Sequence, residues 1–348
     1  MREVRCPIEH TLSGYALSCL TNRMQFLANI HCPTYSTDRE NTGSPISGLQ
    51  SVSPECEVLV RFYPPPAEMR RYFTTFYLVE TKVADGAVID DHLLPEWANL
   101  RFHSGSLPEA KTRSGMSVAG TSFPVTGPSS QAVRFKIGST RMWGIGLLPL
   151  GWAKFVAAPA ADFADALLDG FAHPAFAEFR GLAETLFGEA PDAEAELARI
   201  FEYFRQRADA PATDEARIVA VHAALIDPET ASVAQLVERA GISQRTAERV
   251  FRRDFGFSPK LLLSRQRFMR SLSQFMLDPS LNWIGAIDSH YHDQAQFVRD
   301  CRKFLGMTPS QYAALPKPLI GAIMSERGRV AGASAQTLDS PDGVRQPR

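Results

Sequence analysis

Long apolar runs are absent from this chain of 348 residues, and sequence motifs built on cysteine are absent too. No apolar run approaches the ~20 residues that a membrane-spanning helix needs, so no membrane span is expected. The early stretch TLSGYALSCLTNRMQFLANI is interrupted by Asn22 and Arg23, and no small-residue cleavage site follows it, which argues against a secretory signal. We therefore expect a soluble protein of the cytoplasm.

The five cysteines stand singly and form neither a CxxC pair nor an even disulfide framework; they are Cys6, Cys19, Cys32, Cys56 and Cys301. A zinc-thiolate site needs its ligands clustered on the metal, so these residues are expected to be reduced thiols without a role. The sequence also lacks a nucleophile with a base partner and a phosphate-binding glycine loop. We therefore expect no enzyme activity, no metal and no cofactor.

The net charge of −1 hides a strong division along the chain. Residues 231–315 contain 12 Lys and Arg against 7 Asp and Glu, whereas residues 1–230 contain 20 against 28. A basic surplus confined to one segment is what binding to DNA phosphates requires. A nearly neutral whole chain therefore does not argue against DNA binding.

Two stretches fifty residues apart carry the same pattern. VRDCRKFLGMTPSQY, which runs from Val298 to Tyr312, repeats the upstream stretch ERVFRRDFGFSPKLL. In each copy a glycine (Gly256 or Gly306) suits the left-handed end of a helix, a hydroxyl two residues later can cap the next helix, and a proline fits its first position. Each copy predicts a helix, a sharp stop and a new helix.

Upstream of the first stop, the sequence predicts two helices joined by a short turn. A Ser232-x-x-Gln235 capping box opens the first helix, Gly241 marks the turn, and Ser243 caps the second helix. This helix-turn-helix arrangement would turn arginines toward a major groove of DNA. By helix geometry the inward residues are Ala247, Val250, Phe251 and Phe255, and the outward ones are Gln244, Arg245, Glu248, Arg249 and Arg252.

The second copy, SLNWIGAIDSHYHDQAQFVRDCRKFLG, predicts a similar pair of helices with a turn at residues 290–292. His290 replaces the turn glycine, and the turn can still close at some cost because His tolerates positive φ better than most residues. We expect Trp283, Ile284, Ile287, Phe297, Cys301 and Phe304 inward, and Gln294, Ala295, Val298, Arg299 and Arg302 outward. Between the units, PKLLLSRQRFMRSLSQFML would form a rod about 28 Å long, which suits major grooves about 34 Å apart.

The segment 232–312 resembles the DNA-binding domain of the AraC/XylS family of transcription regulators. The residues that carry the resemblance are Leu236, Gly241, Ser243, Arg249, Phe251, Gly256, Ser258 and Pro259 in the first unit, and Ala286, Phe297, Arg299, Phe304, Gly306, Thr308, Pro309 and Tyr312 in the second. This chain departs from the family at Val237, Ala247, His290-Tyr291 and Cys301. The resemblance implies seven helices that form two helix-turn-helix units, contact with RNA polymerase and, more often than repression, activation.

The preceding half predicts a small β-sandwich or barrel, because short segments rich in β-branched and aromatic residues alternate with Pro and Gly. Ala-rich helical stretches follow around 163–187, 193–207 and 214–225. This half resembles the cupin-like sensing domain of many AraC-family members. The fold expected is thus a two-domain α+β protein: an N-terminal disordered extension at 1–53, a sensing or dimerisation domain at 54–228, the DNA-binding domain at 229–315 and a disordered tail at 316–348.

Two kinds of residue in the β half invite a functional role. His92 and His103 lack the His-x-His spacing of a cupin metal site, so we interpret them as surface or hydrogen-bonded histidines. Trp97, Trp143 and Trp152 could line a ligand pocket, but aromatic residues in a small β domain are more often core. Both interpretations favour structural roles.

The sequence therefore predicts a sequence-specific DNA-binding transcription regulator, which binds double-stranded DNA as a homodimer and responds to a small molecule through its N-terminal domain. Two alternatives stay open: an architectural DNA-binding protein without a ligand, and a DNA-binding domain fused to an unrecognised enzyme. The residues predicted to contact DNA are Gln244, Arg245, Glu248, Arg249, Arg252, Gln294, Arg299 and Arg302.

Overall fold

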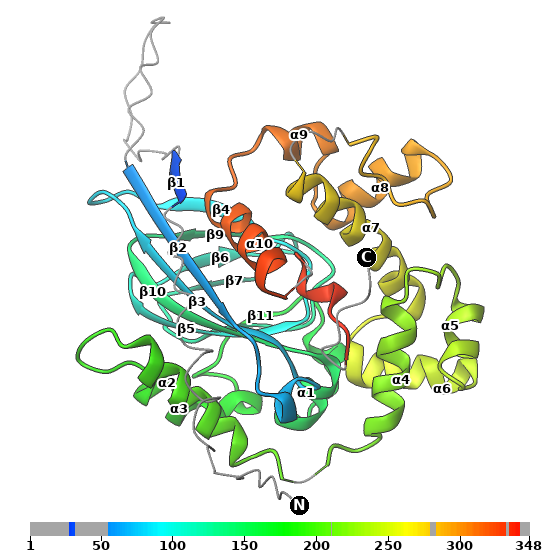
Figure 1. Cartoon of the computed structure of the whole chain (residues 1–348), viewed down its shortest axis with the longest axis horizontal. Helices are drawn as coiled ribbons and strands as arrows, with labels where there is room; N and C mark the ends of the chain where they lie inside the picture. Colours follow the sequence, from blue (N-terminus) through cyan, green and yellow to red (C-terminus); the bar gives the residue numbers. More distant parts are fainter. Residues whose placement is uncertain (1–27, 32–54, 210, 279–282, 332–333, 342–348) are drawn as a thin grey trace, which may run out of the picture.

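The computed structural model describes residues 28–31, 55–209, 211–278, 283–331 and 334–341. A β-rich N-terminal part is followed by a helical C-terminal part, as expected from the sequence. Figure 1 shows the strands on one side of the molecule, the helices α4 to α9 on the other, and the late helix α10 between them. The fold class predicted from the sequence is confirmed in this two-part form.

The strands form two sheets, a seven-stranded one in the order β1-β2-β3-β10-β5-β8-β11 and a four-stranded one in the order β4-β9-β6-β7. Neighbouring strands pair antiparallel throughout the described registers. The bounds are β1 Ala28–His31, β2 Glu55–Tyr63, β3 Phe73–Lys82, β4 Ile89–Leu93, β5 Ala98–Gly105, β6 Glu109–Lys111, β7 Ser117–Ala119, β8 Pro124–Thr126, β9 Val133–Ile137, β10 Thr140–Leu147 and β11 Leu167–Asp169.

Both faces of the large sheet are buried, because successive side chains of β3 belong alternately to two different cores. Phe76 and Leu78 belong to an outer core that helices cover, whereas Tyr77 and Val79 belong to an inner core between the two sheets. Tyr77 crosses directly over Gly144 of β10, where an added Cβ would come within 2.0 Å of the Tyr77 ring. Only glycine permits this approach, which keeps the Tyr77 ring between the sheets.

Helices and turns cover the outer face of the large sheet. They are α1 Pro149–Phe155, η2 Ala160–Phe163, η3 Pro174–Phe179, α2 Arg180–Thr185, α3 Ala193–Arg205 and α4 Glu215–Ile226. The buried Glu196 of α3 accepts a hydrogen bond from Trp143 Nε1 at 2.6 Å and another from Arg141 Nη2 at 2.7 Å. Trp97, Trp143 and Trp152 are core residues, as predicted, with at most 1% of their surface exposed.

Two local predictions in this half were wrong. The stretch TRMWGIGLLPLGWAKFV (140–156) is one of the segments rich in β-branched and aromatic residues that were expected to be strands, but it leaves the sheet after Leu147 and forms α1, since Pro149 occupies the first turn of a helix. The stretch 163–187 is not a continuous helix but contains β11, η3 and the short α2. The helices expected around 193–207 and 214–225 are present as α3 and α4.

The helical part continues with α5 Val233–Arg239, α6 Gln244–Val250, the π-helical turn η4 Phe251–Phe255, α7 Pro259–Leu277, α8 Gln294–Phe304 and α9 Pro309–Ala314. Where the first helix of the second unit was expected, residues 279–282 lie outside the described part and residues 283–286 form a turn. The first unit shares its core with the β domain, because Leu236 and Phe255 join the same cluster as Trp97.

The chain beyond residue 316 does not fit the predicted disordered tail. Residues Pro318–Ala331 form α10, which packs against β2, β4 and α7, and Gln336–Leu338 form η5 against α7. Asp91 of β4 accepts hydrogen bonds from the backbone N–H groups of Leu319 and Ile320, at 3.0 and 2.9 Å, and so caps α10 from another element. Burial raises the pKa of Asp91 to about 6, against the opposing effect of these N–H groups. Local sequence patterns could not predict this helix, because its cap comes from a residue far away in the sequence.

The predicted N-terminal extension falls mostly outside the described residues. Within it, Ala28–His31 forms β1 and pairs with β2. Cys6, Cys19 and Cys32 also lie outside the described part, whereas Cys56 and Cys301 are buried. Burial raises the pKa of the Cys301 thiol to about 12, so this thiol stays protonated and unreactive at neutral pH.

Candidate nucleic-acid interface and ligand pocket

The first helix-turn-helix unit consists of α5 and α6. Ser232 and Gln235 form the predicted capping box, and Ser243 Oγ accepts from the Thr246 N–H at 3.2 Å at the start of α6. The predicted inward residues Ala247, Val250, Phe251 and Phe255 are all at most 1% exposed. Local capping and an apolar stripe therefore fix both helices, as the sequence pattern indicated.

The opposite face of α6 and η4 carries the predicted DNA-contacting side chains. Gln244, Arg245, Glu248, Arg249 and Arg252 are all exposed. Arg253 behaves differently, since its guanidinium forms ion pairs with Asp214 and Asp254 at 2.9 and 2.8 Å. The exposed arginines therefore project from a helix whose back is buried, as base or phosphate contact requires.

The two predicted stops have the expected geometry. Gly256 and Gly306 have φ values of +85° and +83°, the left-handed conformation that other residues adopt only at a cost. Ser258 and Thr308 then cap α7 and α9, with Pro259 and Pro309 in the first turn. The repeat in sequence is thus a repeat in structure.

The second unit closes its turn by a different device from the one expected. Among the described non-glycine residues, positive φ occurs at Ala157, Asp165 and Asp214, so His290 does not adopt it. Instead, Asp288 accepts from the His290 backbone N–H at 2.9 Å, and the His290 ring nitrogen Nδ1 lies 3.1 Å from the same carboxylate oxygen. The backbone strain we expected at His290 is therefore absent.

The inward side of the second unit also departs from the prediction at one residue. Ile284 is 65% exposed rather than buried, because residues 283–286 form a turn instead of a helix. Phe297, Cys301 and Phe304 of α8 are buried as predicted. Gln294, Ala295, Arg299 and Arg302 are exposed, and Val298 is half-buried.

The end of α8 is bound to the β domain. Arg113, from the loop between β6 and β7, donates to the backbone oxygens of Lys303 and Arg302 at 2.8 and 3.3 Å. The Ala132 N–H donates to the Phe304 oxygen at 2.8 Å. A cation at a helix C-terminus is favourable, so these contacts hold α8, the second helix predicted to contact DNA, against the N-terminal domain. Sequence reasoning missed Arg113, since no local signal pairs it with residues 189 positions away.

The interior of the β domain contains two adjoining pockets. One lies between the sheets and is partly open to solvent, and the other, the mouth pocket, lies under α10. Tyr77, Leu93, Arg101 and Ile323 border both. Met269 of α7 lies in the wall of the mouth pocket, which therefore includes the helix that joins the two units.

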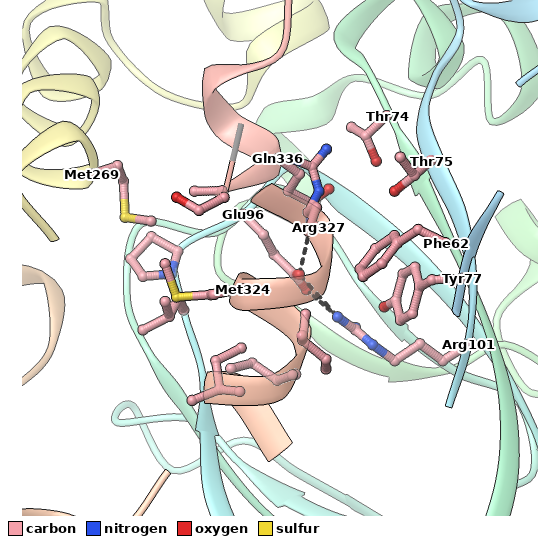
Figure 2. Close-up of a pocket in the computed structure, with 17 residues that line it drawn as sticks. Phe62, Thr74, Thr75, Tyr77, Glu96, Arg101, Met269, Met324, Arg327 and Gln336 are labelled. Carbon is pink, nitrogen blue, oxygen red and sulfur yellow. Dashed lines mark hydrogen bonds and ion pairs between the residues drawn. The ribbon is translucent and has the colours of Figure 1, made fainter. Parts of the chain in front are cut away.

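A polar network centred on Glu96 crosses the mouth pocket, as Figure 2 shows. Arg101 Nη2 donates to both carboxylate oxygens of Glu96, at 2.7 and 2.9 Å. Thr126, Asn99 and Gln336 donate to the same carboxylate, at 2.9, 2.9 and 2.6 Å. Burial alone would lower the pKa of Arg101, but the Glu96 carboxylate raises it overall, so the Arg101 guanidinium is protonated.

The interpretation of His103 as a hydrogen-bonded histidine holds for one ring nitrogen only, since Nδ1 lies 3.5 Å from the Thr140 hydroxyl. His103 is 8% exposed and lines the pocket between the sheets, and its Nε2 has no hydrogen-bond partner. Burial lowers its pKa to about 3, with a further contribution from Arg101, so the ring is neutral. A signal existed in ANLRFHSG: Asn99, Arg101 and His103 alternate with apolar residues and so share one face of β5.

The α5–α6 unit and the second exposed basic helix α8, each with a buried back, fit a DNA-binding domain of the helix-turn-helix class. A family model described as a helix-turn-helix domain matches residues 236–314. The resemblance to AraC-type regulators is thus confirmed for this segment. The comparison with curated proteins gives no match.

Several solved structures are similar at low identity. ToxT from Vibrio cholerae is 11% identical, with a TM-score of 0.38, over 65% of this chain and 96% of ToxT. ToxT from strain SCE256 with bound unsaturated fatty acid is 10% identical, with a TM-score of 0.37, over 68% and 94%. The AraC-like transcriptional activator CuxR is 11% identical, with a TM-score of 0.26, over 62% and 86%. At these values they identify no functional residue of this chain.

No described helix combines the length and the hydropathy needed to cross a membrane.

Proposed function

We propose that this protein is a sequence-specific DNA-binding transcription regulator that binds a small molecule inside its β domain. The observation that carries the DNA-binding part is the repeated unit with a buried apolar back and exposed Arg and Gln side chains. Exposed arginines suit both phosphates and the guanine edge in the major groove. Each of the eight predicted side chains, named above, is exposed, which supports the proposed contact with DNA.

The β domain has a direct physical connection to the DNA-binding part. The buried Arg265 of α7 donates to the backbone oxygens of Ser129 and Glu96, at 2.8 and 3.3 Å, and its guanidinium lies 4.2 Å from the Trp97 ring centre. The Glu96 side chain faces the pocket, while its backbone contacts the helix between the two reading units.

A ligand can shift the equilibrium between two arrangements only through different contacts in each. Two residues connect α7 to the pocket: Met269 lines it, and Arg265 donates to the backbone oxygen of Glu96, which also lines it. A change in α7 would alter the spacing of α6 and α8, and with it the fit to successive major grooves.

Other expectations from the sequence remain predictions. Contact with RNA polymerase follows from the family resemblance, and pairing of two copies follows from the separate core and the Ala-rich helices of the N-terminal domain. DNA binding would place the protein in the compartment that contains the DNA. The open pocket next to α7 favours a ligand-responsive regulator over a purely architectural protein, and a turnover assay with added metabolites would reveal an unrecognised enzyme.

The test is selection of bound duplexes from a random pool, followed by affinity measurements on the enriched duplex and a scrambled one. We expect an enriched motif and a marked preference for it. We also expect log K to fall with log salt at a slope of about −0.9 for each neutralised phosphate. Equal affinity for both duplexes, or a slope near zero, would contradict the proposal.

A further inference from the structure

The pocket between the sheets is almost wholly apolar. Its walls consist mainly of side chains from the inner core, among them Val79, Phe135, Ile137, Met142 and Leu167. A concave, mostly apolar surface with few polar groups favours a mostly apolar small molecule, and the polar groups then fix its orientation. The polar groups present are therefore the guide to the ligand's chemistry.

Two buried polar atoms at this pocket lack a partner. They are the acceptor Nε2 of His103 and the donor Nε–H of Arg101. The two residues stand two positions apart on β5 and line the same cavity. Buried polar groups are normally hydrogen-bonded, so an unsatisfied donor and acceptor at one cavity indicate a missing hydrogen-bonding partner.

The contacts of Thr140 favour one of the two neutral tautomers of His103. The Thr140 hydroxyl donates to the Ser104 backbone oxygen at 3.1 Å, which leaves its lone pairs to face His103 Nδ1 at 3.5 Å, and this arrangement favours the proton on Nδ1. In a neutral ring with Nδ1 protonated, Nε2 holds a lone pair. His103 Nε2 can therefore accept a hydrogen bond from a donor group on the ligand.

The charge balance of the pocket argues against an anionic ligand. The positive charge of Arg101 is already matched by the two oxygens of Glu96. A ligand carboxylate beside Arg101 would place a second negative charge near Glu96, and the lone pair of His103 would face it as another acceptor. Desolvating that carboxylate without a new cation is costly.

We infer that the pocket between the sheets binds a neutral, mainly apolar molecule whose hydroxyl group donates to His103 Nε2 and can accept from Arg101 Nε. A hydroxyl suits both residues because it is at once a donor and an acceptor. That this molecule acts as the effector rests on the proposed function, whereas its binding does not.

The experiment uses three matched probes and isothermal titration of the full-length protein at pH 7 without DNA. 4-Butylphenol offers a neutral hydroxyl, 4-butylanisole has the same shape without a donor, and 4-butylbenzoate is an anion. We expect the phenol to bind about tenfold more tightly than the anisole, since it satisfies a buried acceptor that the anisole leaves unpaired. We expect the benzoate to bind more weakly than the phenol.

Variants of His103 test whether the preference for the phenol over the anisole depends on its Nε2 atom. His103→Leu should reduce the phenol-to-anisole ratio to about one while anisole binding persists, which shows that the pocket is intact. His103→Gln restores an acceptor and should recover part of the ratio. His92→Leu changes a histidine that borders neither pocket and should leave the ratio unchanged.

Three results would overturn the inference: tighter binding of the benzoate, an unchanged ratio in His103→Leu, or no binding of any probe at millimolar concentration. The proposed function is tested separately by measuring DNA affinity with and without the phenol. Phenol binding through His103 with unchanged DNA affinity would support the site and count only against its role as an effector site.

Discussion

Glu96→Ala is expected to lower the free energy of unfolding by about 3–5 kcal/mol, the usual cost of removing one partner of a buried ion pair. Glu96 and Arg101 are 8% and 7% exposed, so the variant leaves a buried Arg101 guanidinium without its carboxylate partner. Asn99, Thr126 and Gln336 would also lose their common acceptor. Chemical denaturation followed by tryptophan fluorescence measures the change.

Two further variants separate charge from packing. Glu326→Ala removes a carboxylate that pairs with the exposed Arg329 on α10, and it should cost less than about 1 kcal/mol. The double variant Glu96→Leu with Arg101→Met removes both buried charges and should recover part of the loss. If Glu96→Ala lowered the free energy of unfolding no more than Glu326→Ala does, the network centred on Glu96 would not stabilise the β domain.

The second large effect is expected at the first reading helix. Arg245→Ala with Arg249→Ala should abolish most sequence discrimination on the enriched duplex, because a good bidentate base contact contributes about 1–3 kcal/mol of discrimination. Gln294→Ala with Arg299→Ala should cause a smaller loss. The α6 face offers Gln244, Arg245, Glu248 and Arg249, whereas α8 presents Ala295 and Val298 among its outer residues.

Affinities on a set of duplexes with every base pair varied in turn measure both losses. An equal loss of affinity on all duplexes would make Arg245 and Arg249 phosphate contacts. A greater loss of discrimination in the Gln294 and Arg299 variant would reverse the ranking of the two helices.

The parts of this structure that the sequence predicted are those with local causes. The caps at Ser243 and Ser258, the left-handed Gly256 and the stripe that ends at Phe255 all act within a few residues, so their patterns can be recognised in the chain. The nineteen residues of α7 match the predicted rod for the same reason. The prediction that Ile284 is buried was wrong because residues 283–286 form a turn instead of a helix, and no local pattern indicated this turn.

The pocket could not be predicted, because contacts between distant residues create it. Asp91 caps α10 from more than 200 positions away, and Gln336 reaches Glu96 across a similar interval. Polar alternation along β5 indicated a shared face for Arg101 and His103, but only the fold shows that this face borders a cavity. Long-range packing, which local patterns do not encode, thus determined the ligand site.

Hydroxyl-radical footprinting of the full-length protein on its enriched duplex tests the central claim most directly. If α6 and α8 enter successive major grooves, we expect two protected segments on one face of the DNA, about one helical turn or 34 Å apart, one for each helix. Arg249→Ala should weaken the protection of one segment and leave the other. A single protected segment, or protection that is the same on a scrambled duplex, would contradict the account.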